Sequence, residues 1–336
     1  MRSQTLGAMR GMILAGGFST RLYPLTLEVP KPLVPVVDRP VVDHVMTYLV
    51  RQGVDELVIN VHYFAAAVET HIGDGAAWGA GMAYLREPEL MGSAGAVKQV
   101  ESLFGSTFVV IGCDDITDVD LHAALAFHRA RGAEATIVLV EAEDVSHYGV
   151  VVVDHDGRIR EFQEKPAPGT ARSNLVNTGI YIFEPEVLAR IPAGAFYDFG
   201  KQVFPKMLAD GAGFYGMQQS AYWCDIGTPS EYRRCHFDAL AGKVRLRPGD
   251  GASVRGTILT GASAHVDPTA RLIGPACIGA GSRVGAGASV ERSILWENVV
   301  VENGAHVRDA VLADGVRVQA GATINGGEHG RNLVLT

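Results

Sequence analysis

The stretch GMILAGG (11–17) decides the fold class, because an apolar run ends there at two glycines. Such a run is typical of a buried strand that leads into a tight turn. Strand-like runs recur at 56–63 and 108–115, and helical apolar spacing marks 41–53 and 121–132. This alternation predicts an α/β fold. We expect a Rossmann-like, mixed but mostly parallel sheet with helices on both faces, which binds ligands beyond the carboxyl ends of its strands.

From about residue 247 the sequence is dominated by Gly, Ala and Val, and apolar residues recur every six positions. A six-residue period is typical of a parallel β-helix, with one inward apolar residue per short face and small residues at the corners. A flexible Gly/Ala-rich linker would not keep this frame. The expected inward residues are Val266, Leu272, Ile278, Val284, Val290, Ile294, Val300, Leu312, Val318 and Ile324, with a slip of four after Val290 and a break at His306.

The domain organisation follows from these two patterns. We expect a flexible N-terminal extension over 1–10, a sheet domain over 11–246 and a β-helix domain over 247–336. The opening residues are too polar for a secretory signal, so they are interpreted as an extension or an upstream start.

Composition excludes several function classes. The net charge is −8, which argues against a general nucleic-acid binder. The four cysteines form no CxxC pair, so neither a disulfide framework nor a structural zinc site is expected, and a cytoplasmic location fits. No apolar stretch reaches the roughly 18 residues that a membrane span requires, so no membrane partner is expected.

A candidate phosphate site lies in LAGGFSTRLYPLT (14–26) and PKPLVPV (30–36). Two glycines let backbone N–H groups approach a phosphate, and Arg21 adds a fork of donors suited to its oxygens. Lys31 stands between two prolines, which hold its ammonium group on a stiff segment. Alone, each residue would be an ordinary turn glycine or surface cation; their spacing favours phosphate binding. The segment is neither a GxxxxGK[ST] loop nor a GxGxxG motif.

These motifs resemble the signature of the sugar-1-phosphate nucleotidyltransferases, LAGGxGTRLxPLT followed by PKP. The resemblance covers nearly the whole chain after residue 10 and is closest to the mannose-1-phosphate guanylyltransferase branch with C-terminal hexapeptide repeats, which implies a left-handed β-helix. Ser19 stands where the family usually has Gly. The implied nucleotide-binding residues are Leu14, Ala15, Gly16, Gly17, Ser19, Thr20, Arg21, Lys31, Glu87 and Gly92.

The resemblance also implies a magnesium site. CDDITDVDL (113–121) aligns Asp114 with a metal-binding aspartate, although Cys113 replaces a Gly and the adjacent Asp115 competes for the role. YWCDIGTPSEY (222–232) places Asp225 as the second ligand. Two carboxylates suit Mg²⁺, a hard cation that bridges substrate phosphates. Either acid alone would more often be a helix cap or a turn residue.

The base and the sugar are assigned to further segments. EPELMGSAGAVK (87–98) resembles the base-binding loop, where Gly92 would let the base approach the backbone. The two acceptors of the Glu87 carboxylate match the two donors of guanine, which favours GTP, unless Glu87 only caps the turn before Pro88. The implied residues on the sugar-phosphate side are Gly149, Glu164, Lys165 and Asn177, with Asp198 a weaker candidate.

The implied reaction joins an NTP and a sugar 1-phosphate into an NDP-sugar and pyrophosphate. The attacking phosphate oxygen is already anionic, so charge neutralisation by Arg21, Lys31 and Lys165, the expected catalytic residues, matters more than a general base. Three alternatives remain: a glucose-1-phosphate thymidylyl- or uridylyltransferase, a catalytically silent regulatory paralogue, or an acyltransferase site in the β-helix. Homo-oligomerisation through the β-helix is expected. Candidate acyltransferase bases are His265, His306 and His329.

Overall fold

The computed structural model describes residues 9–336, and these form two compact units. The first unit contains the described residues up to Gly17 together with Val45–Trp223, and the second contains Phe18–His44 and Cys224–Thr336. The segment predicted as one sheet domain, 11–246, therefore contributes residues to both units. Arg10, the last residue of the predicted extension, begins strand β1, and the rest of that extension up to residue 8 lies outside the described part of the chain.

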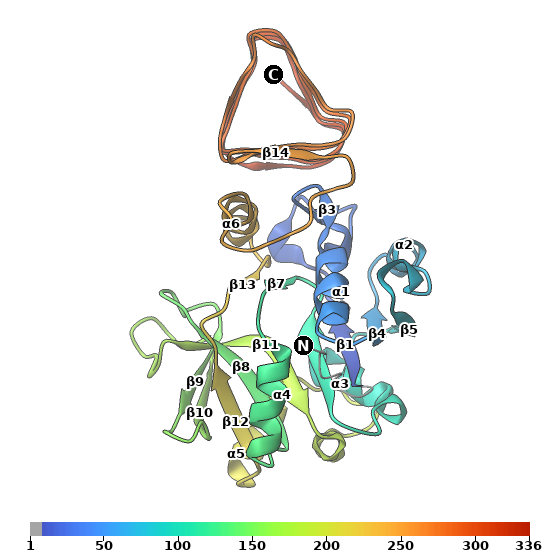
Figure 1. Cartoon of the computed structure of the whole chain (residues 1–336), viewed down its shortest axis with the longest axis vertical. Coiled ribbons are helices and arrows are strands. Elements are labelled where there is room, and N and C mark those ends of the chain that lie inside the picture. The colour runs from blue at the N-terminus through green and yellow to red at the C-terminus, as the bar shows by residue number, and fades with distance from the viewer. Residues whose placement is uncertain (1–8) are drawn as a thin grey trace, which may run out of the picture. The chain divides into compact units, whose positions relative to one another are not determined.

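The parallel half of the sheet in the first unit is built around the strand expected from GMILAGG. β1 (Arg10–Leu14) lies between β6 (Phe108–Gly112) and β4 (Glu56–Val61), and β4 is followed by β5 (Gly81–Arg86) (Figure 1). All these neighbours pair in parallel. Their carboxyl ends therefore share one edge of the sheet, where the glycine turn begins.

The other half of the sheet contains the antiparallel pairs that make the sheet mixed. β11 (Leu175–Phe183) pairs antiparallel with β6, β8 (Ala135–Glu141) and β9 (Gly149–Val153). β9 also pairs antiparallel with β10 (Ile159–Glu164), whereas β12 (Phe214–Gln218) pairs in parallel with β8. The α/β class and the mixed sheet are confirmed, and the parallel pairs are concentrated around β1.

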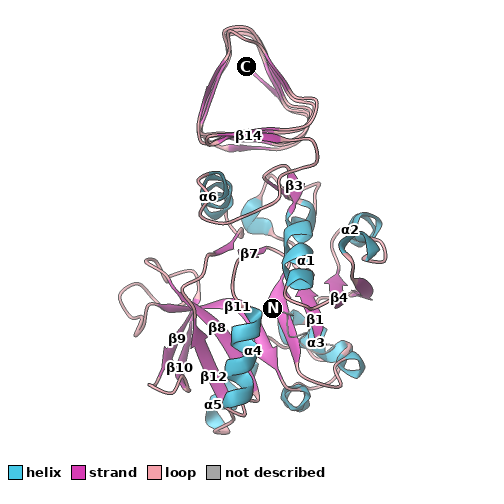
Figure 2. Cartoon of the chain, in the orientation of Figure 1, coloured by secondary structure: helices cyan, strands magenta, loops and turns pink. Residues whose placement is uncertain are grey.

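Helices and an aromatic cluster complete the first unit, and Figure 2 shows the helices in cyan. Asp120 begins α4 by accepting a hydrogen bond from the N–H of Ala123, as an N-cap does. The helices are α2 (Ala65–Ile72), α3 (Gly92–Gln99), α4 (Leu121–Ala130) and α5 (Phe204–Ala209), and α1 (Val41–Arg51) runs from one unit into the other. The aromatic side chains that pack together in the core are Phe108, Tyr181, Phe183, Phe199, Phe204 and Phe214.

The second unit combines a short hairpin, helix α6 and the β-helix. The hairpin pairs β2 (Pro35–Val36) with β3 (Arg39–Pro40), and α6 (Pro229–Leu240) is capped by the hydroxyl of Thr228. The β-helix coils form the triangular outline of Figure 1, with three sheets of mostly parallel strands. Its strands are β14 (Ser253–Arg255), β15 (Ile258–Thr260), β16 (His265–Val266), β17 (Arg271–Ile273), β18 (Ala276–Ile278), β19 (Arg283–Val284), β20 (Ser289–Glu291), β21 (Ile294–Leu295), β22 (Val300–Val301), β23 (His306–Arg308), β24 (Val311–Leu312), β25 (Arg317–Val318), β26 (Thr323–Asn325), β27 (Glu328–His329) and β28 (Val334–Leu335).

The inward series of the β-helix differs from the prediction after Val290. The buried core residues are Leu295, Val301 and Val307, so the predicted Ile294 and Val300 are each one position too early. The series also continues through Val307, where a break at His306 was expected. The reason is a shorter corner. Ile273 pairs with Glu291, and Cys277 pairs with Ile294, so the corner Gly274–Ala276 is replaced by Arg292–Ser293 one coil later. Arg292 turns it with a left-handed φ of 46°.

None of the helices within residues 9–336 is long and apolar enough to cross a bilayer.

Candidate active site

The glycine turn after β1 packs against two polar side chains of the first unit, Asn60 and Glu87, which we call the floor of the turn. The N–H of Ala15 donates to Oδ1 of Asn60 at 2.9 Å. A Cβ on Gly16 would lie 2.7 Å from Nδ2 of Asn60 and 2.8 Å from Oε2 of Glu87, so no larger residue fits there. Gly17 is exposed, and no described atom lies within 4 Å of the position where its Cβ would be. Gly16 therefore fits against Asn60 and Glu87, while Gly17 leaves space for a ligand beside its own backbone.

Glu87 belongs to this floor. Its side chain is nearly buried, with the residue 4% exposed. Its Oε2 accepts from Nδ2 of Asn60 at 2.6 Å, and its Oε1 accepts from the N–H of Met91 at 3.1 Å. To read a base, each oxygen would have to accept a second hydrogen bond. Asn60 was missed by the sequence analysis, although a lone amide in the apolar run ELVINV was a visible signal.

Gly92 is required by a close backbone approach. Its φ is +75°, and a Cβ there would lie 2.5 Å from the carbonyl oxygen of Tyr197. The same oxygen accepts from the N–H groups of Ala94 and Gly95 at 3.0 Å. The glycine thus has a structural reason at this position, and its predicted contact with a base remains a prediction.

The loop that carries Arg21 belongs to the second unit. Ser19, which replaces the family's glycine, has a left-handed φ of 56°, a conformation in which glycine carries little strain. Its carbonyl oxygen accepts from Thr26 Oγ1 at 2.9 Å and from the Leu22 N–H at 3.1 Å, which holds the turn. The adjacent Thr20 is exposed.

Arg21, Lys31 and Asp225 lie together in the second unit. Nζ of Lys31 is 3.4 Å from one carboxylate oxygen of Asp225, and the Arg21 guanidinium is 4.0 Å from the other. The Lys31 side chain is 11% exposed, whereas that of Arg21 is 56% exposed. A Cβ on Gly227 would lie 2.7 Å from Nη2 of Arg21, so the glycine leaves room for the guanidinium. Two cations around one carboxylate leave a net positive cluster suited to phosphate groups.

The two adjacent aspartates after β6 have different surroundings. Asp115 is buried; its Oδ2 accepts from the Gly112 N–H and its Oδ1 from the Trp223 indole, both at 3.0 Å. Asp114 is partly exposed. Asp115 therefore serves the protein's own donors, and the assignment of Asp114 as a metal ligand remains a prediction. Asp114 belongs to the first unit and Asp225 to the second.

Three of the candidate sugar-phosphate residues lie where β9 begins and β10 ends in the first unit: Gly149, Glu164 and Lys165. Glu164 ends β10, and Nζ of the next residue, Lys165, is 4.0 Å from its Oε1. Burial raises the pKa of the Glu164 carboxyl, an effect that Lys165 opposes and Asp198 reinforces. A Cβ on Gly149 would lie 2.7 Å from the ring of Phe162, so this glycine makes room for a side chain of β10.

Asn177 and Asp198 are already hydrogen-bonded within the first unit. Asn177 donates to the hydroxyl of Tyr181 at 3.0 Å and accepts from the Gly179 N–H at 2.9 Å. Asp198 accepts from the hydroxyl of Ser93 at 2.9 Å. Burial raises the pKa of Tyr181, and the negative charges of Asp198, Asp115 and Glu164 add to that rise. The sequence analysis missed Tyr181, a polar group whose pKa responds to three of the acids that it did name.

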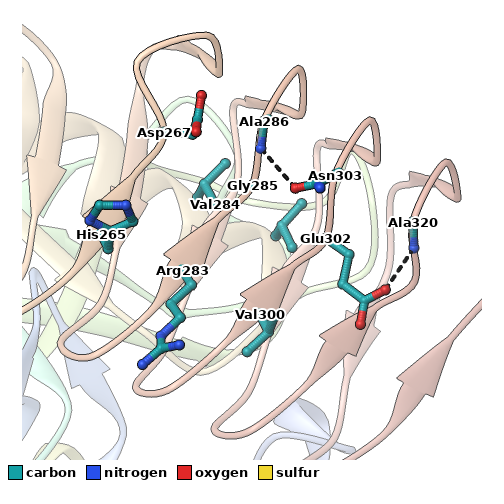
Figure 3. Close-up of a pocket in the computed structure, with 11 residues that line it drawn as sticks. His265, Asp267, Arg283, Val284, Gly285, Ala286, Val300, Glu302, Asn303 and Ala320 are labelled. Carbon is teal, nitrogen blue, oxygen red and sulfur yellow. Dashed lines mark hydrogen bonds between the residues drawn. The ribbon is translucent and has the colours of Figure 1, made fainter.

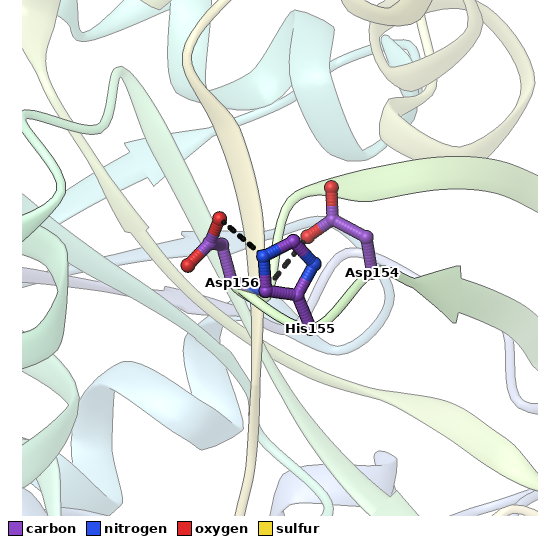
Figure 4. Close-up of side chains that lie close together, drawn as sticks. All are labelled: Asp154, His155 and Asp156. Carbon is purple, nitrogen blue, oxygen red and sulfur yellow. Dashed lines mark hydrogen bonds and ion pairs between the residues drawn. The ribbon is translucent and has the colours of Figure 1, made fainter.

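Two other polar groupings lie outside these residues. Asp154, His155 and Asp156 form a small exposed cluster (Figure 4), but Asp154 caps its own turn and pairs with Arg160. On the β-helix, His265 lines a shallow groove of about 350 Å³ along β16, β19 and β22 (Figure 3). The three histidines considered as acyltransferase bases, His265, His306 and His329, lie on three different sheets of the β-helix and are not brought together.

Known proteins resemble this chain over most of its length. The nucleotidyl transferase family matches residues 10–241, and the GlmU-like C-terminal hexapeptide family matches residues 263–327. A UTP–glucose-1-phosphate uridylyltransferase from Synechocystis sp. is 35% identical over 90% of this chain and 87% of that protein. A mannose-1-phosphate guanylyltransferase from Mycobacterium tuberculosis is 34% identical over 87% of this chain and 81% of that protein.

Solved structures agree with these sequence relatives. HddC from Yersinia pseudotuberculosis, in a complex with GMP-PN, superimposes with a TM-score of 0.60 and 27% identity. The match covers 68% of this chain and 98% of that one. This chain belongs to the nucleotidyl transferase family, among the sugar-1-phosphate nucleotidyltransferases that carry C-terminal hexapeptide repeats.

Proposed function

We propose that the protein transfers guanylyl groups from GTP to a hexose 1-phosphate, with mannose 1-phosphate the preferred acceptor, and releases pyrophosphate. The observation that carries this proposal is the extended similarity to mannose-1-phosphate guanylyltransferases from bacteria, plants and insects. These relatives are 34–36% identical and cover 80–89% of this chain. The cation cluster of the second unit supports it with a site for the triphosphate.

The chain's own residues supply binding and charge neutralisation. A phosphate oxygen of the sugar phosphate attacks the α-phosphorus of the nucleotide and forms a new P–O bond, and pyrophosphate leaves with the electrons of the bond that breaks. Arg21 and Lys31 hold the triphosphate, and Lys165 holds the phosphate of the sugar. Since the attacking oxygen is already ionised, no proton has to be removed from it, and catalysis depends on positioning and electrostatics.

Asp114 and Asp225 would hold Mg²⁺. Their carboxylate oxygens are the ligand type that Mg²⁺ prefers, and the ion would supply charge neutralisation on the nucleotide phosphates. Asp225 suits this task because its present partners are side-chain cations at 3.4 and 4.0 Å, which can move to the phosphates when a metal ion takes their place.

A second candidate function is uridylyl transfer to glucose 1-phosphate, favoured by the Synechocystis relative. A pyrophosphate-release assay with GTP, UTP, dTTP and ATP against mannose 1-phosphate and glucose 1-phosphate separates the two functions. We expect the highest kcat/KM with GTP and mannose 1-phosphate. A preference for UTP and glucose 1-phosphate would overturn the proposal, and no turnover with any pair would identify a silent paralogue.

The role of Glu87 in base selection has its own test. In our proposal its carboxylate accepts from N1–H and N2–H₂ of guanine, so Glu87→Gln should lower kcat/KM for GTP relative to UTP by about tenfold or more. If Glu87→Gln lowers turnover equally with every nucleotide, the residue only supports the glycine turn through Asn60. Gln99→Ala, which removes a longer contact of 3.5 Å to the same carboxylate, is the matched control.

We further propose that the enzyme acts in the cytoplasm as a homo-oligomer assembled through the β-helix. All four cysteines of the chain lie in the described residues as buried thiols, which suits a reducing compartment. Light scattering of the full chain and of a Val334→Asp variant on the exposed last strand would test the assembly.

A further inference from the structure

A buried polar cluster in the second unit joins the Lys31 segment to α6 and to the β-helix. The carbonyl oxygen of Pro35 accepts from the hydroxyl of Tyr232 at 2.6 Å and from Nε2 of His236 at 3.1 Å. The indole of Trp296, on the β-helix, donates to the same tyrosine hydroxyl at 2.8 Å. Tyr232, His236 and Trp296 are each at most 2% exposed. We call these four residues the Pro35 clamp.

Histidine chemistry in the clamp is consistent with one neutral tautomer. Nε2 must carry the proton that goes to Pro35, and Nδ1 then accepts from the Val37 N–H at 3.4 Å and from the thiol of Cys277 at 3.2 Å. Burial lowers the pKa of His236 to about 3, so the neutral form persists at physiological pH. The histidine thus ties the hairpin to α6 and to the first coils of the β-helix.

The clamp acts on both sides of the Lys31–Asp225 pair. Lys31 precedes Pro35 by a single 3₁₀ turn, in which prolines at 30, 32 and 35 restrict the backbone. Asp225 lies just before Thr228, the cap of the helix that carries Tyr232 and His236. Two hydrogen bonds to one carbonyl oxygen therefore fix the Lys31 segment against the Asp225 segment.

The tip of the β2–β3 hairpin, Val37 and Asp38, makes a second set of contacts between the Lys31 segment and the β-helix. Val37 and Asp38 both have left-handed φ values, 45° and 65°. The carboxylate of Asp38 accepts from the Ala280 N–H at 3.1 Å. A Cβ on Gly261 would lie 2.5 Å from that carboxylate, and one on Gly249 would lie 2.3 Å from the Asp38 carbonyl oxygen. The tip therefore fits a recess that these glycines leave open.

The β-helix also reaches α6 and the Arg21 loop. Arg233 of α6 donates to the carbonyl oxygen of Asp309 at 2.6 Å, and Arg292 stacks on the ring of Phe237. At a later coil, a Cβ on Gly330 would be 3.6 Å from Cβ of Pro24, an ordinary packing distance. Contacts thus run along the β-helix to the segments that carry Arg21, Lys31 and Asp225.

We propose that the β-helix is a positioning element for nucleotidyl transfer: Trp296 and Tyr232, acting through Pro35, hold Lys31 against Asp225 in the geometry that binds the triphosphate. This inference rests on the proposed function, because it assigns a task to the same cation cluster. Tyr232 and Trp296 touch no substrate; they are positioning residues that act through Lys31. A small displacement of a charge at a preorganised site weakens its stabilisation of the transition state. Losing either hydrogen bond should therefore weaken phosphate binding and catalysis by the cation cluster.

The test removes single donors: Tyr232→Phe keeps its ring, and Trp296→Phe replaces the buried indole by a smaller aromatic ring. Tyr232→Phe and Trp296→Phe are compared with Tyr84→Phe, which removes a hydroxyl that donates to the Gly73 carbonyl oxygen at 2.6 Å in the first unit. For the full-length variants at 25 °C, we measure kcat, the KM values of both substrates and the binding of inorganic pyrophosphate by calorimetry. Thermal unfolding of each variant shows that it is folded. Should Tyr232→Phe not fold, Trp296→Phe, which leaves the bond between Tyr232 and Pro35 in place, decides.

The proposal expects an about tenfold loss of kcat and of pyrophosphate affinity in both clamp variants, with the KM of the sugar phosphate unchanged. The double variant should be no worse than the more damaged single variant, since the two bonds are in series. Clamp variants that are folded and match Tyr84→Phe in both readouts would overturn it. A wild-type protein that binds pyrophosphate but turns over no nucleotide would refute the proposed function instead, while the binding comparison would still judge the clamp.

Discussion

The two compact units hold their polar residues in different ways. In the first unit, Glu87 with Asn60 and Asp115 with Trp223 are paired at 2.6 to 3.0 Å. In the second unit, Asp225 has its two cations at 3.4 and 4.0 Å, and the side chain of Arg21 is 56% exposed. Short, buried hydrogen bonds stabilise the fold, whereas longer, partly exposed ion pairs contribute less to stability and exchange partners more easily. Glu87, Asn60 and Asp115 of the first unit are therefore held in place, whereas the cluster around Asp225 in the second unit presents charge to a ligand.

The largest effect that this comparison predicts is on catalysis. Lys31→Ala should lower kcat by about 10²–10³ because it removes a charge from a preorganised site, and it should change the unfolding temperature little. Steady-state pyrophosphate release measures it. Lys243→Ala, which removes an exposed cation 2.7 Å from Asp238, is the control and should keep wild-type turnover. A Lys31→Ala enzyme with normal kcat would show that the cluster is only a surface ion pair.

Lys165 on the first unit should separate the two substrates. Lys165→Ala is expected to raise the KM of the sugar 1-phosphate and to lower kcat, also by about 10²-fold, because the ammonium holds that phosphate. Initial rates with each substrate varied in turn measure both constants. An increase confined to the KM of the nucleotide would contradict the assignment of Lys165 to the sugar side.

A smaller effect, on stability, is expected from the floor of the glycine turn. Asn60→Ala leaves the buried Glu87 carboxylate and the Ala15 N–H without a shared partner, so the free energy of unfolding should fall by about 1–3 kcal/mol. Urea unfolding measures the change. Asn174→Ala, in the loop before β11, provides a comparison at an exposed amide. An Asn60→Ala protein as stable as wild type would show that the floor is not held by these bonds.

The smallest effect concerns pH and the second unit. The folded state keeps His236 neutral down to a pKa of about 3, whereas the unfolded chain protonates it near 6.5. Unfolding therefore takes up a proton in this window, and stability falls as the pH is lowered from 6.5, by about 1.4 kcal/mol per pH unit for one proton.

His236→Gln should remove that contribution from the slope between pH 6 and 5, measured by denaturant unfolding at each pH. Burial raises the pKa of Asp38 to about 6, which acts in the opposite direction, but Asp38 is present in both proteins and cancels in the difference. Equal slopes for the two proteins would contradict the neutral buried histidine.

Local periodicity predicted much of the fold, and long-range pairing did not follow from it. The alternation around 11–17 and the six-residue repeat after 247 correctly indicated the α/β sheet and the β-helix. The antiparallel pairing of β11 with β6 joins residues about 70 positions apart, which no local pattern encodes. At the corner that Arg292 turns, the step between inward residues shortens from six positions to five, from Val290 to Leu295. Ile294 and Leu295 are both apolar, so the sequence pattern does not tell which of them faces the core.

The candidate site was predicted to the extent that its residues lie in contiguous motifs. Arg21 and Lys31 were found from their own surroundings, and the structure brings them to Asp225. Asn60 and Tyr181 were missed because their importance lies in partners: Asn60 matters through Gly16 and Glu87, far away in the sequence. Glu87 and Gly92 were predicted to contact the nucleotide base. The packing shows that Glu87 also accepts a hydrogen bond from Met91, and that a side chain at Gly92 would collide with the backbone of Tyr197.

We propose that Asp114 and Asp225 are both ligands of the divalent ion that binds with the nucleotide. Binding of Mn²⁺, a spectroscopic substitute for Mg²⁺, in the presence of GTP tests it most directly by electron paramagnetic resonance titration of the wild type, Asp114→Asn, Asp225→Asn and the double variant. We predict that Asp114→Asn and Asp225→Asn each weaken Mn²⁺ binding by about tenfold or more and change the spectrum of the bound ion. Asp115→Asn should leave Mn²⁺ binding unchanged. Wild-type Mn²⁺ affinity and an unchanged spectrum in either Asp114→Asn or Asp225→Asn would contradict the claim.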